Sequence, residues 1–485
     1  MSQSSMQINK RLENLQTHLA DEHPDNPTLA KAVQSFRKLD EVAYSLGLLK
    51  KDQSYATRVS WWPMIAVLGT FSAGKSTFIN SHLNLPLQRT GTQAVDDKFT
   101  VICYSHNDEA KVLPGVALDA DPRFPFYQIS RSIAEISEAG QQRIDAYLQL
   151  KTCPAENIRG RILIDSPGFD ADSQRSSTLR LTQHIIDLAD LVLVFFDARH
   201  PEPGAMQDTL DYLVSATIDR ADSNKFLYVL NQIDVTAKED NPEDVVAAWQ
   251  RSLAQAGLTA GRFYRIYNEE AAAPIDDPQV RERYEKKREE DMTEIGVRMQ
   301  QVEVERSYRI VGALEQTAKS IENQMVPKLT DMIKRWKKRV WISDGLLAGA
   351  IAGIAAIAFS MTSTWDLVAN FIAGVGTGEV FSLIVLALLL AGAGYLHFSM
   401  RKAAGNHMLR QLTQEYVDDD DLLEQYSSAF SKSIAGYRPM FLSKPSGWSG
   451  LSKQILEEVK TEANDYIQVL NDRFTNPSGR SKENS

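Results

Sequence analysis

A glycine-rich segment carries a lysine and a serine at the spacing of a phosphate-binding loop. It reads Gly69-Thr-Phe-Ser-Ala-Gly74-Lys75-Ser76-Thr77 and lies between an apolar run and a stretch with helical periodicity. Glycines let successive backbone N–H groups point at phosphate oxygens, and a helix N-terminus adds partial positive charge. The lysine reaches the β- and γ-phosphates, and the serine hydroxyl binds Mg²⁺. The sequence therefore predicts a nucleotide site formed by Gly69, Ser72, Ala73, Gly74, Lys75, Ser76 and Thr77.

A second motif, Asp165-Ser-Pro-Gly168, follows the apolar run Arg161–Ile164. An aspartate at the end of a buried strand can hold Mg²⁺ through water, and a glycine N–H can contact a γ-phosphate. We therefore predict that Asp165 and Gly168 belong to the same site. Ser76 and Asp165 are the predicted metal-binding residues.

A third motif, Asn231-Gln232-Ile233-Asp234, follows the apolar run Phe226–Leu230. A carboxylate can accept two hydrogen bonds from guanine, one from N1–H and one from the exocyclic amine, and adenine cannot offer this pair. The motif predicts that Asp234 recognises guanine and that Asn231 and Gln232 complete the site. The alternative is an ordinary turn after a strand.

Residues 61–275 alternate short apolar runs with helical patterns, which is typical of a mostly parallel sheet. We predict an α/β P-loop nucleotide-binding domain with a doubly wound, mostly parallel sheet. The predicted strands are Met64–Leu68, Thr100–Tyr104, Arg161–Ile164, Leu191–Phe196, Phe226–Leu230 and Phe263–Ile266.

The rest of the chain has helical periodicity. We predict N-terminal helices at 1–60 that pack on a helical stalk at 276–341, C-terminal helices at 403–474, and a disordered tail at 475–485. Pro327 is expected to kink the stalk helix. An apolar stripe suited to packing on other helices is formed by Val311, Leu314, Ala318, Ile321, Met325, Leu329, Met332 and Trp336.

Two stretches without Asp, Glu, Lys or Arg lie within 342–402, at about 345–365 and 380–400. About 20 apolar helical residues span a bilayer, so we predict a two-helix transmembrane hairpin. Basic residues flank it at 328–339 and 401–402, which predicts cytoplasmic termini and a loop, 366–379, on the far side. Candidate interfacial anchors are Trp336, Trp341 and Tyr395. The alternatives are a buried helical hairpin and a paddle that inserts part-way or conditionally.

Composition limits the possible functions. The chain has 485 residues and a formal net charge of −10, which argues against a nucleic-acid-binding protein. Two cysteines, Cys103 and Cys153, provide neither a disulfide framework nor a zinc site, and we expect buried thiols in a reducing compartment. The opening MSQSSMQINKR has no apolar core, so we expect no secretory signal peptide.

The motifs together resemble those of the dynamin superfamily of large GTPases. The nucleotide domain is most similar to that of EHD-type membrane-remodelling ATPases, in the segments GTFSAGKSTFIN, DDKFTVICY, VLPGVALDADPRFPF, ILIDSPGF, LVLVFFDARHPEPG and VLNQID. The hairpin resembles that of mitofusin-like and bacterial dynamin-like proteins. The resemblance implies a dynamin-type G domain at 61–275, two transmembrane segments, and the bacterial inner membrane as location.

The resemblance also implies catalytic roles, the sequence departs from the family pattern in two places, and the choice of base stays open. Ser72 matches a loop serine that family members use to organise a monovalent cation or the β–γ bridging region, and Lys75 would carry much of the charge stabilisation. The switch I segment reads A-V-D-D at 94–97 where EHD-type relatives have P-T-T-D, so Thr92 in a shifted register, or Asp96 near the metal, is the candidate there. Gln232 replaces the lysine of N-K-x-D. EHD-type proteins keep the aspartate of that motif and use ATP, so ATP stays possible beside GTP.

These inferences predict a membrane-anchored dynamin-like GTPase that converts GTP to GDP and phosphate with Mg²⁺. Nucleotide binding would order the switch region and pair nucleotide domains into a homodimer or a larger homo-oligomer. Assembly would then drive fission, fusion or tethering of a lipid membrane. The alternatives are a nucleotide-binding membrane scaffold with little hydrolysis and an EHD-like ATPase.

Overall fold

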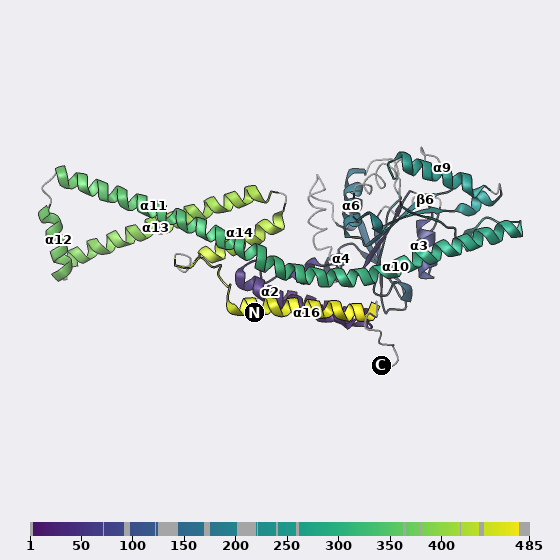
Figure 1. Cartoon of the computed structure of the whole chain (residues 1–485), viewed down its shortest axis with the longest axis horizontal. Helices are drawn as coiled ribbons and strands as arrows, with labels where there is room; N and C mark the ends of the chain where they lie inside the picture. Colours follow the sequence, from purple (N-terminus) through teal and green to yellow (C-terminus); the bar gives the residue numbers. More distant parts are fainter. Residues whose placement is uncertain are drawn as a thin grey trace. The chain divides into compact units, whose positions relative to one another are not determined.

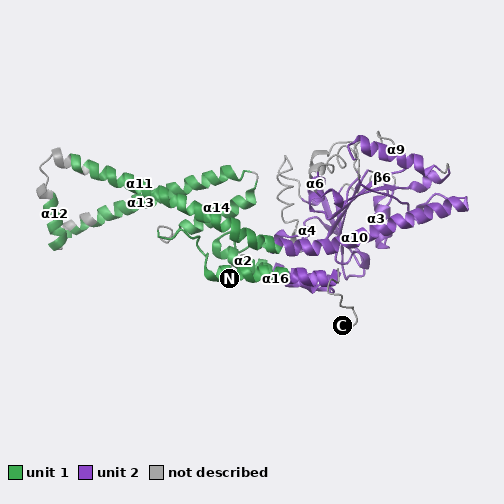
Figure 2. Cartoon of the chain, in the orientation of Figure 1, with its two compact units in different colours: residues 1–8, 34–55, 314–464 green, residues 9–33, 56–313, 465–485 purple. Residues whose placement is uncertain are grey.

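The computed structural model describes residues 3–70, 72–91, 98–121, 123–124, 144–168, 175–200, 220, 222–238, 241–258, 261–361, 365–377, 380–417, 419–435 and 441–474. The chain forms two compact units (Figure 2). Unit 1 comprises residues 1–8, 34–55 and 314–464, and unit 2 comprises residues 9–33, 56–313 and 465–485.

An eight-stranded sheet forms the centre of unit 2 (Figure 1). Its order is β3-β4-β2-β5-β1-β6-β7-β8. The strands β5, β1, β6, β7 and β8 are parallel, β2 pairs antiparallel with β5, and β3 pairs antiparallel with β4. The predicted mostly parallel α/β sheet is confirmed. Its strands are β1 (Met64–Gly69), β2 (Phe99–Tyr104), β3 (Lys111–Pro114), β4 (Leu148–Cys153), β5 (Ile162–Asp165), β6 (Leu191–Asp197), β7 (Phe226–Asn231) and β8 (Arg262–Arg265).

The strands that are buried on both faces are the ones that the sequence predicts most clearly. Every residue of β1, β2, β5, β6 and β7 is buried, and strands covered on both faces read as continuous apolar runs. The sequence does not predict β3 or β4. All four residues of β3 are exposed, and a buried lysine, Lys151, interrupts the apolar pattern of β4. Cys103 and Cys153 are free and buried, as expected.

Helices complete unit 2 and cover the sheet. They are α3 (Lys75–Leu83), α4 (Ala117–Ala120), α6 (Arg175–Leu188) and α9 (Pro242–Gln255), with short 3₁₀ turns η3 (Ile144–Ala146), η4 (Glu156–Ile158), η6 (Ser223–Lys225), η7 (Ile233–Lys238) and η8 (Glu269–Ala271). Parts of α1 (Gln3–Glu22), α2 (Pro27–Leu46), α10 (Pro278–Ser320) and α16 (Gly450–Phe474) also belong to it. One buried cluster joins α3 and α10 to the sheet and includes Ile65, Phe78, Ile79, Leu193, Phe195, Ile295, Met299 and Val302.

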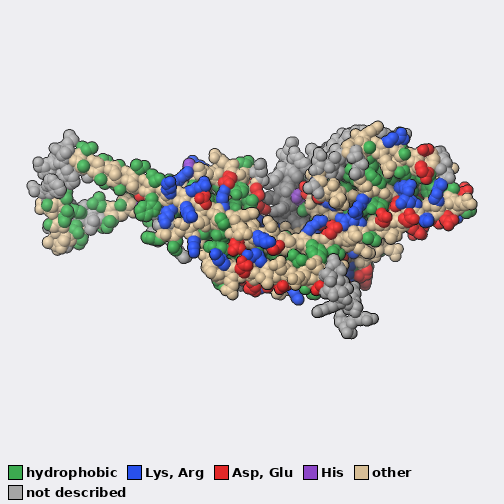
Figure 3. All heavy atoms as spheres, viewed as in Figure 1, with side chains coloured by type: hydrophobic (Ala, Val, Ile, Leu, Met, Phe, Trp, Pro, Cys, Tyr) green, Lys and Arg blue, Asp and Glu red, His purple; other side chains and the backbone are tan. Residues whose placement is uncertain are grey.

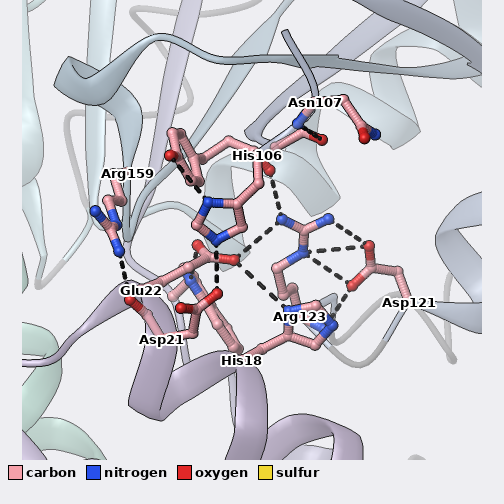
Figure 4. Close-up of polar contacts among 11 residues, drawn as sticks. His18, Asp21, Glu22, His106, Asn107, Asp121, Arg123 and Arg159 are labelled. Atoms are coloured by element: carbon pink, nitrogen blue, oxygen red, sulfur yellow. Dashed lines mark hydrogen bonds and ion pairs between the residues drawn. The ribbon is translucent and has the colours of Figure 1, made fainter.

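A buried ionic cluster attaches the end of α1 to the sheet within unit 2 (Figure 4). Arg123 donates to Glu22 Oε1 at 3.2 Å, to the Tyr104 carbonyl at 2.9 Å and to Asp121 Oδ2 at 2.7 Å. Glu22 ends α1, and Tyr104 ends β2. Glu22 and Arg123 are both buried, so their charges depend on one another for compensation.

Arg123→Met should destabilise unit 2 by about 3–5 kcal/mol, because it leaves the buried carboxylate of Glu22 without its cation. Chemical denaturation followed by circular dichroism would measure the loss. Arg159→Met is the matched control: its ion pair with Glu156 is largely exposed and should contribute less than about 1 kcal/mol. Equal, small effects of the two substitutions would contradict a stabilising role for the cluster.

Unit 1 is built from helices. Besides parts of α1, α2, α10 and α16, and the 3₁₀ turn η1 (Tyr55–Arg58) at its boundary, it contains the π-helical turn η9 (Ile321–Met325), α11 (Val326–Met361), α12 (Trp365–Thr377), α13 (Val380–Glu415) and α14 (Asp420–Ile434). On α2, Lys38 Nζ donates to Glu462 Oε1 of α16 at 2.6 Å, and Ser35 Oγ donates to Glu462 Oε2 at 2.6 Å. Asp419 caps α14 by accepting from the Leu422 N–H at 2.9 Å.

The apolar stripe predicted for the stalk is confirmed, since all eight of its side chains are buried. The interruption expected at Pro327 takes the form of the π-helical turn just before it. Proline has no N–H to donate, and such a turn is a common way to accommodate the break. Trp336 was a predicted interfacial anchor, but it is wholly buried and donates to the Arg401 carbonyl at 3.1 Å.

The helices of the predicted hairpin form, but its connection differs from the prediction. Residues 366–379 are predicted as a loop, whereas most of them belong to α12. Its apolar composition, LVANFIAGVG, favours a helix once it can pack on α13. Among the helices that the structure describes, none is both long enough and apolar enough to cross a bilayer, so the two predicted spans are not confirmed.

Large apolar side chains are nevertheless exposed along these helices (Figure 3). Ile354 on α11 is 69% exposed and Leu388 on α13 is 67% exposed. Trp341 and Tyr395, the other two predicted anchors, are also exposed. Exposed apolar surface on this scale marks a region that contacts another apolar partner.

Candidate nucleotide-binding site

The phosphate-binding loop connects β1 to α3 and has the backbone that its sequence predicts. Gly69, Ser72 and Gly74 all have positive φ angles, of 149°, 62° and 82°. At Gly69 a Cβ would lie 2.4 Å from the Phe195 carbonyl oxygen, so only glycine fits between β1 and β6. Gly74 lies just before α3, which places Lys75, Ser76 and Thr77 in the first helical turn.

The Lys75 side chain is folded back over the loop. Its ammonium donates to the carbonyls of Gly69 and Thr70, both at 2.9 Å. Burial lowers the pKa of Lys75 to about 8, although the nearby Asp165 carboxylate partly opposes the shift. A buried ammonium that donates to two neutral carbonyls would gain greatly from an anionic phosphate.

The third motif is hydrogen-bonded to the phosphate-binding loop. Asn231 Nδ2 donates to the Ala73 carbonyl at 2.8 Å, and Gln232 Nε2 donates to the Ser72 carbonyl at 2.7 Å. A Cβ at Gly74 would lie 2.2 Å from Asn231 Nδ2, which explains the glycine there. Gln232 therefore braces the loop.

Asp234 is buried at the start of η7, next to these contacts. Its Oδ2 accepts from the Ala273 N–H at 2.7 Å, and burial raises its pKa. Arg199 lies nearby: it donates to the Ser72 carbonyl at 3.2 Å and pairs with Asp197 at 2.6 Å. The hydrogen bonds that Arg199 donates to Asp197 raise the pKa of Arg199, so the guanidinium stays charged beside the loop.

The predicted metal-binding residues lie on adjacent elements. Ser76 is in the first turn of α3, and Asp165 ends β5, which pairs with β1. One hydroxyl and one buried carboxylate beside a phosphate loop fit Mg²⁺, which takes few protein ligands and completes its shell with phosphate and water. Among the described residues, no group of three or more His, Cys, Asp or Glu could hold a metal alone.

Some predicted residues cannot be placed, and others were missed. Thr92 and Asp96 lie outside the described residues, so their catalytic roles stay predictions. Gly168 follows β5 in an irregular segment. Sequence reasoning missed Arg199, which lies two residues after the end of β6. It also missed Gln88 and Lys151, which lie in no recognisable motif.

A parallel sheet, a glycine-rich loop at the end of its central strand, and two further motifs at neighbouring strand ends define a P-loop nucleotide-binding domain. Residues 65–233 match the model of the dynamin family. The predicted resemblance to the dynamin superfamily is therefore confirmed for this domain.

Known relatives match this part of the chain. EH domain-containing protein 1 from Bos taurus is 28% identical over 182 residues, covering 36% of this chain and 31% of that protein. EH domain-containing protein 3 from Rattus norvegicus is 28% identical over 179 residues, with the same coverage. The match thus spans under a third of these relatives.

Among solved structures, one similar chain comes from an oligomerised bacterial dynamin pair, described as providing a mechanism for the long-range sensing and tethering of membranes. It aligns with 96% of this chain and 80% of its own length, at 13% identity and a TM-score of 0.32.

Nucleotide affinity should depend on pH through Lys75. Its pKa of about 8 in the free protein should rise when phosphate binds, so binding takes up a proton above pH 8. Affinity should be constant below pH 8 and fall by up to about tenfold per pH unit above it. Calorimetric titrations at pH 7, 8 and 9, in buffers of different ionisation enthalpy, would show both effects. Affinity that stays constant to pH 9 would contradict them.

Proposed function

We propose that the protein is a dynamin-like nucleoside triphosphatase that binds GTP with Mg²⁺, hydrolyses it to GDP and phosphate, and acts on a lipid membrane. The observation that supports the nucleotide part is a pair of hydrogen bonds between two loops. Asn231 donates to the Ala73 carbonyl, and Gln232 donates to the Ser72 carbonyl. These contacts join Asn231 and Gln232 to the phosphate loop, which supports one site for both the base and the phosphates of a nucleoside triphosphate.

Catalysis would consist of positioning and charge neutralisation during phosphoryl transfer to water. Lys75 would leave its two loop carbonyls for the β- and γ-phosphates. Mg²⁺, when bound, supplies further neutralisation, and Ser76 and Asp165 would hold it. Ser72, Thr92 and Asp96 are the proposed further catalytic residues, and the Gly168 N–H would contact the γ-phosphate.

Guanine is the proposed base because a carboxylate complements its N1–H and exocyclic amine. Burial raises the pKa of Asp234, and the nearby guanidinium of Arg199 partly opposes this shift, which helps the ionised form that accepts both bonds. Displacement of a bound fluorescent nucleotide by GTP and by ATP tests this assignment. Stronger displacement by GTP supports it, and equal or stronger displacement by ATP would favour an EHD-like ATPase.

The membrane part rests on unit 1. Apolar side chains are exposed on α11 and α13, and Lys334, Lys337 and Lys338 line a hollow of about 500 Å³ together with Trp341 and Ile342. Exposed lysines next to exposed apolar side chains suit a surface with anionic headgroups above acyl chains. Arg401, predicted to be part of this basic flank, is instead buried and stacks on Trp336.

We propose that 342–402 enters the bilayer and that both termini are cytoplasmic. Protease treatment of sealed vesicles would test the orientation, because the segment 366–379 should be protected from the cytoplasmic side.

The proposed domains are N-terminal helices (1–60), a G domain (61–275), a stalk (276–341) and C-terminal helices (403–474). Nucleotide-dependent homodimers or larger homo-oligomers would form through the G domain, and light scattering with a non-hydrolysable GTP analogue would detect them.

A second candidate is a nucleotide-binding membrane scaffold with little hydrolysis. The observation that favours it is the A-V-D-D sequence at 94–97, which lacks the threonine that usually closes over Mg²⁺. Single-turnover hydrolysis in the presence of liposomes separates the two candidates. A rate no faster than buffer would favour the scaffold, and a faster rate would favour the enzyme.

A further inference from the structure

A buried series of polar side chains ends on the carboxylate of Asp165. Lys151, in β4, donates from its ammonium to Gln88 Oε1, and Gln88 Nε2 donates to Asp165 Oδ2 at 2.6 Å. Gln88 is only 3% exposed and Lys151 only 6% exposed. The three motifs that predict the nucleotide site contain neither Gln88 nor Lys151.

The orientation of the Gln88 amide follows from the chemistry of its partners. An ammonium can only donate hydrogen bonds, and an ionised carboxylate can only accept them. The carbonyl end of the amide must therefore face Lys151, and the NH₂ end must face Asp165. If the amide were rotated by half a turn, its NH₂ group would face the ammonium of Lys151 and its oxygen would face the carboxylate of Asp165. Donor would then face donor and acceptor would face acceptor in a buried site, which is unfavourable.

The backbone of Gln88 is fixed to α3. Asn80 accepts from the Gln88 N–H at 2.7 Å and donates to the Gln88 carbonyl at 2.8 Å. The same helix carries Lys75 and Ser76 in its first turn. These contacts therefore connect the orientation of Asp165 to the helix that presents the phosphate- and metal-binding side chains.

We propose that Gln88 is a positioning residue for nucleotide-bound Mg²⁺, and that it acts by holding the Asp165 carboxylate while Lys151 holds the amide. This inference rests on the proposed function, because Mg²⁺ and a nucleotide are the ligands concerned. A carboxylate offers about four acceptor positions, so one bond from Gln88 orients the group and leaves capacity for a metal-bound water. Residues that orient a metal ligand typically change metal affinity by about 10–100-fold.

The opposite role, a gate that must swing away before Mg²⁺ binds, fits the contacts poorly. Displacement of the amide would take a hydrogen-bond partner from the buried ammonium of Lys151. It would also strain a residue whose backbone is held at both its N–H and its carbonyl. Gln88 is therefore expected to stay in place when nucleotide binds.

The test is the affinity of the full-length protein for a fluorescent GTP analogue, measured with millimolar Mg²⁺ and again with EDTA. Gln88→Leu keeps the approximate size and removes the amide. Combining it with Lys151→Met removes the buried ammonium that would otherwise lose its Gln88 partner, so that folding is preserved. We expect this double variant to lose about tenfold or more in affinity with Mg²⁺, and to keep wild-type affinity in EDTA.

Gln149→Leu is the matched control. Gln149 also lies in β4, but its Nε2 donates to Thr100 Oγ1 at 2.7 Å, away from Asp165. This variant should bind like wild type with and without Mg²⁺. Equal losses of the double variant in Mg²⁺ and EDTA would show a merely structural role and overturn the proposal. An unchanged or increased affinity with Mg²⁺ would overturn it too. Failure of the wild-type protein to bind the analogue would instead refute the proposed function.

Discussion

Replacement of Lys75 by alanine should lower the affinity for GTP by about 100-fold or more. The ammonium already lies within the loop, 2.9 Å from the carbonyls of Gly69 and Thr70. Hydrogen bonds to charged groups contribute about 1.5–3 kcal/mol each, and about 3 kcal/mol corresponds to roughly 100-fold in affinity. Calorimetric titration of wild type and variant with GTP and Mg²⁺ measures the difference.

The fold should survive this substitution. Burial lowers the pKa of Lys75 from 10.5 to about 8, so the ammonium is less favourable in the folded than in the unfolded chain. The unfolding temperature should therefore not fall. Lys111→Ala, on the exposed strand β3, is the control and should bind GTP like wild type. An unchanged affinity of Lys75→Ala would refute the assignment of the phosphate site.

Ile354→Asp combined with Leu388→Asp should abolish binding to liposomes. Both side chains are more than two-thirds exposed, on α11 and α13, and neither substitution removes core packing. A carboxylate in the bilayer core costs about 2.5–3.5 kcal/mol on insertion scales, so two of them should reduce membrane partitioning by more than about 1,000-fold. Flotation of the protein with anionic liposomes measures the effect.

The control for this experiment places the same charges elsewhere. Val112, on β3, and Val297, on α10, are exposed apolar residues of unit 2. Val112→Asp combined with Val297→Asp adds the same net charge and should leave flotation unchanged. Equal losses in the two double variants would mean that charge alone governs binding, and that α11 and α13 do not enter the bilayer.

Much of the nucleotide domain can be predicted because its chemistry is local in sequence. Strands buried on both faces are continuous apolar runs, and the phosphate loop needs its glycines within a few residues of one another. The strand β4 escapes prediction because Lys151 looks like a solvent-exposed residue. Its contacts with Gln88, 63 residues away, and with the Leu87 carbonyl help to explain why a lysine is buried there.

In the stalk helices, too, local sequence predicts only part of the structure. Periodicity predicts the apolar stripe of the stalk, and all of its side chains are buried. Position beside the charge-free stretch, which predicts both Trp336 and Trp341 as interfacial anchors, does not distinguish them, although the first is wholly buried and the second is 60% exposed. Which of two neighbouring aromatic residues faces the protein depends on the helices packed against it.

The sequence by itself determined the mostly parallel α/β sheet, the phosphate loop at its central strand and the two further motifs at strand ends, since each depends on residues close together in the chain. Tertiary structure alone decided that Arg123 pairs with Glu22, that Gln232 braces Ser72 and that Gln88 holds Asp165. The physical reason is that such side chains become buried partners only after distant segments meet. Hydrogen-bond and charge compensation in a buried site leaves no periodic signal in the sequence.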